Sequence, residues 1–169
     1  MDEDLLSKAK SVEARHAAKA LLKLAKIKQA PVELRLVLPH VSPTFNLVVR
    51  GTKSLPRGVD ALLHREEGFS LIGYSELVAP VRQKFSVAHE LGHLHMGHVH
   101  GRSSVDLDSA DFDEIEANQF AAHLIMPISF LRSDIKAGMH DVDALARRYV
   151  VSPEAMWWQL SKSGLIKLL

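Results

Sequence analysis

The feature that most constrains this chain is a pair of histidines four residues apart, His89 and His93. They lie in a stretch that is made largely apolar by Phe85, Val87, Ala88, Leu91, Leu94 and Met96. Apolar residues occur on nearly all sides of a helix drawn through this stretch, which indicates that the helix is buried. A buried helix does not keep two imidazoles without giving each of them a partner. Because residues four apart on a helix lie on one face, the two rings can share one metal ion.

Glu90 directly follows the first of these histidines. In a His-Glu-x-x-His helix this glutamate stands where its carboxylate can act as the general base toward a water molecule at the metal. The expected metal is Zn²⁺, with His89 and His93 as two of its ligands. The chain has no cysteine, so thiolate ligands, disulfides and a cysteine nucleophile are all excluded. The pattern therefore predicts the chemistry of a zinc hydrolase and leaves its substrate open.

A catalytic zinc site needs a third protein ligand, and the predicted helix 112–125 offers Glu114 and Glu116. Glu114 shares its side of the helix with small and apolar residues, which is typical of a face turned inward. Glu116 shares its side with Gln119 and His123, and we expect that polar face to be solvated. The pattern favours Glu114 as the third ligand, with Glu116 as the alternative.

Small residues on both helices support this arrangement. A glutamate reaches a metal on a neighbouring helix only where the two helices approach closely, and Gly92 on one helix with Ala117 and Ala121 on the other would permit that approach. Asn118, four residues after Glu114, would then be placed to orient a ligand histidine through a hydrogen bond.

A histidine could also serve as the third ligand, as in the protease pattern that has glycine three residues and histidine six residues after the second histidine. Met96 and Val99 occupy those positions here, and the nearest matches, Gly97 and His100, come one residue late. The fit is therefore poor. We interpret residues 98–111 as a polar loop.

The rest of the chain reads as a mixture of helices and strands, without internal repeats. Alternation of apolar and polar residues predicts strands over 32–38, which Pro39 would stop, 45–50, 59–64 and 69–74. Apolar residues at helical spacing predict helices over 5–28, from Pro80 through the histidine pair, and over 112–125, 128–137, 141–149 and 153–163. We expect two parts, a core over 1–127 and a helical subdomain over 128–169.

Composition limits the partners. The formal net charge is +1, which gives no global electrostatic reason to expect a nucleic acid or a membrane surface as partner. No stretch is long and apolar enough to predict a transmembrane helix. The acidic N-terminal residues do not resemble a signal peptide, so we expect a cytoplasmic protein.

Two spaced motifs resemble the ImmA/IrrE family of zinc metallopeptidases. The first is Lys84-Phe-Ser-Val-Ala-His-Glu-Leu-Gly-His-Leu, and the second is Glu114-Ile-Glu-Ala-Asn-Gln-Phe-Ala-Ala-His-Leu-Ile-Met-Pro. The tail from Val142 onward is also similar to the family. Residues 80–165 carry the resemblance well, and residues 1–79 share only its general layout. The chain departs from the family at Lys84, where arginine is common, and at His123, where glutamate is common; neither is a proposed ligand.

This resemblance implies an α+β, zincin-like core with a small mixed or antiparallel sheet and a three-helix C-terminal part. It also implies a zinc-dependent endopeptidase that cleaves a protein substrate, a helix-turn-helix repressor encoded nearby in a mobile element or stress-response operon. An extended substrate could pair with a strand such as Phe69–Tyr74. Tyr74 and Tyr149 are candidates for stabilising the oxyanion by residue type alone.

Two other functions stay open at this stage. The chain could be a regulatory or interaction protein, such as a toxin–antitoxin partner, with a vestigial or structural metal site. Residues 141–163 also have the length of a helix-turn-helix motif. Direct nucleic-acid binding is nevertheless not expected, because Lys162 is the only basic residue in the second helix of this motif. The other prominent residues of that helix are Met156, Trp157, Trp158 and Leu160.

Overall fold

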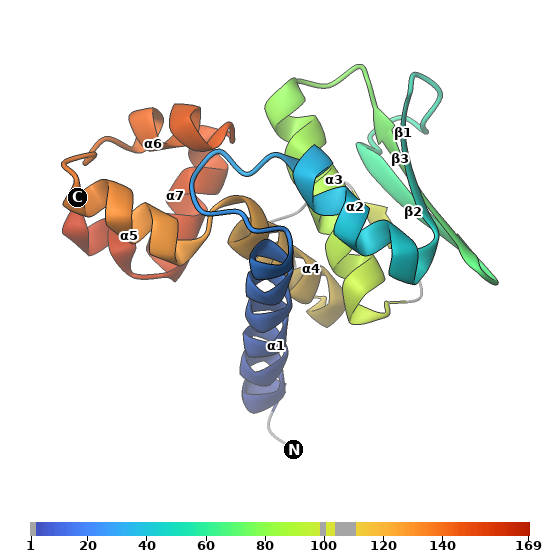
Figure 1. The fold of residues 1–169 in the computed structure, drawn as a ribbon, viewed down its shortest axis with the longest axis horizontal. Coiled ribbons are helices and arrows are strands. Elements are labelled where there is room, and N and C mark those ends of the chain that lie inside the picture. The colour runs from blue at the N-terminus through green and yellow to red at the C-terminus, as the bar shows by residue number, and fades with distance from the viewer. Residues whose placement is uncertain (1–2, 99–100, 104–110) are drawn as a thin grey trace.

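A computed structural model describes residues 3–98, 101–103 and 111–169 of the chain (Figure 1). In chain order these residues form α1 (Glu3–Leu24), α2 (Leu34–Phe45), β1 (Leu47–Thr52), β2 (Ala61–Glu66), β3 (Phe69–Ser75), α3 (Pro80–Met96), β4 (Gly101–Ser103), α4 (Phe112–Ile125), α5 (Ile128–Lys136), α6 (Val142–Tyr149), α7 (Pro153–Lys162) and a short 3-10 helix, η1 (Leu165–Leu168). The α+β fold class predicted from the sequence is confirmed.

The strands form one mixed sheet in the order β1-β3-β2-β4. β1 pairs parallel with β3, whereas β2 pairs antiparallel with both β3 and β4. β2 and β3, which match the strands predicted over 59–64 and 69–74, form a hairpin, and Gly68 in its turn has a φ of 74°, a conformation that glycine adopts without steric cost. Because β3 is a central strand, the expectation that residues 69–74 receive a substrate strand is wrong; β1 and β4 are the edges of the described sheet.

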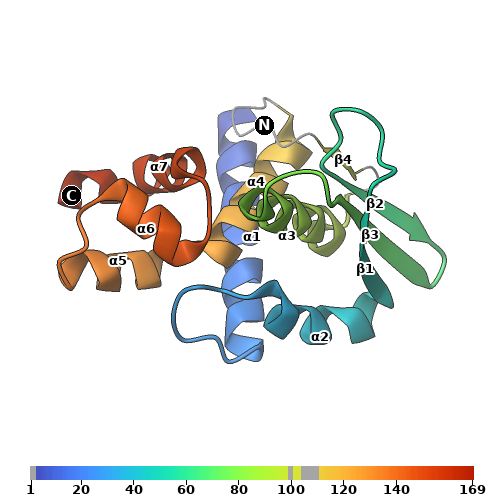
Figure 2. The same ribbon diagram turned by 90° about the horizontal axis from the view of Figure 1, so that it is seen from above.

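The helix that carries the histidine pair lies in the middle of the molecule. α3 packs against β2 and β3 on one side and against α4 on the other, and α4 also packs against α1. Figure 2 shows this order, with α3 and α4 between the sheet and the C-terminal helices. Residues 85–94 of α3 are all buried, as its apolar composition predicts.

The strand predicted over 32–38 is wrong, because α2 occupies most of it and continues through Pro39 to Phe45. Val37 and Val41 are four residues apart and both are buried, so a helical stripe and not an alternating one faces the core. Pro39 and Pro43 lie on the exposed side of the helix.

The three C-terminal helices predicted from the sequence are present as α5, α6 and α7, and they gather at one end of the molecule (Figure 1). Ser152 caps α7 by accepting a hydrogen bond from the backbone of Ala155, and Pro153 follows in the first turn. The division of the chain after residue 127 stays a prediction. Among the described helices, none has both the length and the apolar character that crossing a bilayer requires.

Candidate metal centre

The structure brings three of the predicted ligands together. The Nε2 atoms of His89 and His93 lie 2.9 Å apart. Oε2 of Glu114 lies 3.2 Å from Nε2 of His89, and Oε1 of Glu114 lies 3.3 Å from Nε2 of His93. Ligands bound to one tetrahedral Zn²⁺ at about 2.0–2.1 Å would be roughly 3.3 Å from one another. Two imidazole nitrogens and a carboxylate at this separation fit a zinc ion.

Burial sets the character of this cluster. His89, Glu90 and His93 have no exposed surface, whereas the side chain of Glu114 is 21% exposed. The site is therefore enclosed by the protein and accessible at Glu114, which leaves one side for water or substrate.

Close contact between α3 and α4 lets Glu114 reach the histidines. A Cβ atom added to Gly92 would lie 2.9 Å from both the Cα and the carbonyl oxygen of Ala117. Only glycine allows this approach, as the small residues of the two motifs predict. Asp111 starts α4 by accepting a hydrogen bond from the backbone of Asp113, so Glu114 stands in the first helical turn.

The charge of Glu114 is favoured by its neighbours. Burial alone would raise the pKa of this carboxyl, but hydrogen bonds from His89 and His93, together with their charge, lower the pKa to about 2. Glu114 is therefore ionised over the whole physiological range, as a metal ligand needs to be.

His89 is held from behind by α4. Its Nδ1 lies 2.9 Å from Oδ1 of Asn118, and both residues are buried. An amide oxygen only accepts, so Nδ1 donates this hydrogen bond, and a neutral ring then has the lone pair of Nε2 available for a metal. The sequence predicts this hydrogen bond from a ligand histidine to Asn118.

His93 is held by a longer chain of contacts that the sequence reasoning missed. Its Nδ1 lies 2.9 Å from Nδ1 of His98, and Nε2 of His98 lies 2.8 Å from a carboxylate oxygen of Glu116. His98 and Glu116 are only 7% and 3% exposed. The expectations that His98 belongs to a polar loop and that Glu116 faces solvent are therefore wrong. Within that predicted loop, Gly101–Ser103 form strand β4, and residues 99–100 and 104–110 lie outside the described residues.

The end of α3 explains how His98 reaches His93. Gly97 has a φ of 78° and donates its N–H to Leu94, while the N–H of His98 bonds to the carbonyl of His93 at 2.9 Å. This pair of contacts is a Schellman motif, which turns the chain back over the last helical turn. The ring of His98 consequently lies against that of His93, with centroids 5.0 Å apart.

The two tyrosines considered for the oxyanion lie elsewhere. The hydroxyl of the fully buried Tyr149 donates a hydrogen bond to Asp134 at 2.8 Å, and burial raises its pKa. Tyr74 lines a cavity of about 570 Å³ together with Lys84 and Val87, which lie on the side of α3 turned away from His89. Neither position supports the proposed role.

The family model described as "Peptidase_M78: IrrE N-terminal-like domain" matches residues 45–161. The chain belongs to this family. The M78 match includes the sheet and both helices of the candidate metal centre.

Among solved structures, the M78 chain is similar to a Mycobacterium tuberculosis transcriptional regulator, with a TM-score of 0.66 and 18% sequence identity. The similarity covers 88% of this chain and 47% of the regulator, so this chain spans about half the length of that protein. At this identity the likeness shows a shared fold. No curated protein matches the sequence.

Proposed function

We propose that this chain is a zinc-dependent endopeptidase of the ImmA/IrrE type, with His89, His93 and Glu114 as metal ligands and Glu90 as general base. The observation that supports it best is the convergence of three ligand side chains beside a buried glutamate, with distances of 2.9, 3.2 and 3.3 Å between the ligand atoms of each pair of side chains. Membership of a family described as peptidases agrees with the proposal.

A zinc ion held by these ligands would polarise the scissile carbonyl and lower the pKa of a water molecule. The carboxylate of Glu90 would take the proton from that water and pass it to the leaving amine. Asn118 would keep the ring of His89 in the correct orientation and tautomer.

His98 and Glu116 would do the same for His93. A metal on Nε2 of His93 leaves the proton on Nδ1, which then donates to Nδ1 of His98. His98 in turn carries its own proton on Nε2 and donates it to the carboxylate of Glu116. Every donor in this row of hydrogen bonds from His93 to Glu116 meets an acceptor, and the negative charge of Glu116 makes His93 a more basic ligand.

The substrate in this proposal is a protein, a helix-turn-helix repressor encoded nearby, and the setting is the cytoplasm. A substrate in extended form could add to an edge of the sheet, and β4 is the edge strand that packs against α3. We do not propose direct DNA reading by α6 and α7. Trp157 is 56% exposed on α7, and an exposed aromatic ring suits a protein partner better than base edges.

The alternative is a regulatory protein that binds a partner, such as a toxin–antitoxin component, without cleaving it. It draws on the similarity to a protein named a transcriptional regulator. Both proposals allow bound zinc, so zinc content alone does not separate them.

The test is cleavage of the co-encoded repressor by the purified chain and by Glu90→Gln, with zinc content measured in both. We expect one zinc per chain in each protein, and loss of cleavage by roughly a hundredfold or more in the variant. Equal cleavage by both proteins would exclude Glu90 as the base, and no cleavage by the unchanged protein with zinc bound would favour the regulatory alternative.

A further inference from the structure

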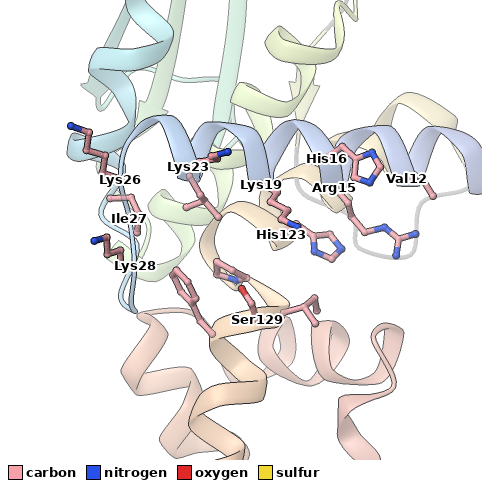
Figure 3. Close-up of a pocket in the computed structure, with 14 residues that line it drawn as sticks. Val12, Arg15, His16, Lys19, Lys23, Lys26, Ile27, Lys28, His123 and Ser129 are labelled. Carbon is pink, nitrogen blue, oxygen red and sulfur yellow. The ribbon is translucent and has the colours of Figure 1, made fainter.

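Another cavity, which shares no lining residue with the metal centre, lies between α1 and the junction of α4 with α5 (Figure 3). Its volume is about 790 Å³, within the range of about 300–1,000 Å³ that is typical of small-molecule sites. The lining residues are Val12, Arg15, His16, Lys19, Leu22, Lys23, Lys26, Ile27, Lys28, His123, Pro127, Ile128, Ser129 and Phe130. We call this cavity the basic groove, because five lysines or arginines line it and none of its described lining residues is an aspartate or glutamate.

Among the side chains that the structure describes, the three cations of the groove that lie on α1 have no acidic partner. None of Arg15, Lys19 and Lys23 forms an ion pair with any side chain that the structure describes, and Arg15 donates its Nε–H only to the backbone oxygen of Ser11. A cleft lined by charges of one sign concentrates its field on the space inside. The groove is therefore suited to an anion.

The positions of the charges indicate an elongated anion. Arg15, Lys19 and Lys23 follow one another at four-residue intervals on α1, so they are spread over roughly 12 Å of the helix axis. Figure 3 shows Arg15 and Lys19 projecting from α1 toward His123 on α4. A single phosphate would contact only part of this row, whereas a chain of linked phosphates would contact most of it.

The groove also has an apolar part. Four apolar side chains line it beside the cations: Leu22 near the end of α1, Ile27 just after that helix, and Ile128 and Phe130 of α5. Ser129 adds a hydroxyl in the first turn of α5, where unpaired backbone N–H groups favour negative charge. An apolar wall with an aromatic ring next to a row of cations suits a ligand that is planar at one end and polyanionic at the other.

The ionisation of His123 agrees with a positive field in the groove. Burial and the charge of the neighbouring Arg15 lower the pKa of His123 to about 4. His123 is therefore neutral near pH 7 and free to donate one hydrogen bond to an anion.

We propose that the basic groove binds a small polyphosphorylated ligand, of the class of nucleoside polyphosphates. The bounded volume favours a small molecule over a nucleic-acid strand, and the row of cations favours linked phosphates over a single carboxylate or phosphate. This proposal concerns a site apart from the metal centre, and it does not depend on peptidase activity.

The test is titration calorimetry of the full chain with ATP and with inorganic triphosphate, in buffer without magnesium. The protein is freed of metal beforehand, because triphosphates chelate zinc. We expect both probes to bind and both affinities to fall at least about tenfold in Arg15→Gln/Lys19→Gln. The control is Lys53→Gln/Lys136→Gln, which removes the same charge from two exposed positions outside the groove.

Phe130→Leu separates the two sources of phosphate. Weaker ATP binding by Phe130→Leu, with unchanged triphosphate binding, would assign the groove to a nucleotide. If ATP and triphosphate bind with the same affinity as each other, both in the unchanged protein and in Phe130→Leu, the groove would be assigned to inorganic polyphosphate. Absence of binding by both probes would overturn the proposal, as would equal losses in the groove and control variants. A single-stranded oligonucleotide that binds more tightly than ATP and is lost in the groove variant would replace the small ligand with a nucleic acid.

Discussion

Glu114 and Glu116 stand two residues apart on α4, and their surroundings differ. The side chain of Glu114 is 21% exposed and faces two histidine nitrogens, whereas that of Glu116 is 4% exposed and meets one imidazole, that of His98, at 2.8 Å. In the proposed metal centre, the more exposed carboxylate would hold an ion that a substrate could also reach. The enclosed one can act on that ion only through His98 and His93. Two identical side chains on one helix thus have different surroundings, because Glu114 faces two histidines of α3 and Glu116 faces His98, just beyond the end of α3.

The largest expected effect comes from the exposed carboxylate. Glu114→Gln removes a proposed ligand and its charge, so zinc affinity should fall by more than about 100-fold. Competition with a chromophoric chelator measures this. Glu154→Gln, which changes an acidic residue in the first turn of α7, is the control. Equal zinc affinities in the two variants would show that Glu114 is not a ligand.

The enclosed carboxylate should matter less but measurably. Glu116→Gln weakens the acceptor at the end of the chain that orients His93, and changes of this kind cost about 10- to 100-fold in metal affinity. The control is Glu66→Gln, which alters an exposed glutamate 2.9 Å from His64. The ¹⁵N shifts of His98 in the zinc-bound protein report its tautomer and should change in Glu116→Gln. Unchanged affinity and shifts would exclude the proposed relay.

Both carboxylates depend on the approach of α4 to α3. Gly92→Ala should force the helices apart at Ala117, lowering the free energy of unfolding by about 1–3 kcal/mol. Gly73→Ala is the matched control, because an added Cβ there meets only Leu55 at 3.9 Å. Thermal unfolding of the metal-free proteins measures both. Equal stability of the two variants would mean that the close approach is not required.

The smallest effect is expected at the other end of α4. The pKa of His123 is about 4 in the folded chain and near 6.5 in the unfolded chain, so between these values the unfolded chain binds more protons and stability falls as the pH falls. His123→Gln should therefore lose less stability than the unchanged protein between pH 6.5 and 4. Denaturant titrations at several pH values measure this, with exposed His40→Gln as the control. An equal change in both variants would contradict the assignment to His123.

Most of the fold around the metal centre was predictable because its signals are local. The helical spacing of α3 and α4, the hairpin of β2 and β3, and the capped helix α7 all follow from residues within a few positions of each other. Glu114 and Asn118 were also accessible to prediction, since the small residues Gly92 and Ala117 marked which helix faces meet.

The errors arise where tertiary packing decides. Residues 32–38 alternate like a strand, but burial of Val37 and Val41 on one side selects a helix. His98 follows the last turn of α3, and only the left-handed Gly97 brings it back to His93. Glu116 looked solvated on its own helix, because its partner His98 comes from another element. A glycine directly before a histidine at a helix end is the one local signal that could have indicated this contact.

The hydrogen bond between Nδ1 of His93 and Nδ1 of His98 contains a single proton, and this links the metal-binding capacity of the two side-chain clusters on either side of it. His98, Asp113 and Glu116 also have ligand atoms close enough to surround a cation. A cation on Nε2 of His98 would release the proton bound there, and the shared proton would then stay on Nδ1 of His98. With its Nδ1 accepting that hydrogen bond, a neutral His93 would carry its own proton on Nε2. That nitrogen could no longer bind zinc. While both rings are neutral, an ion in one of these two clusters therefore excludes an ion in the other.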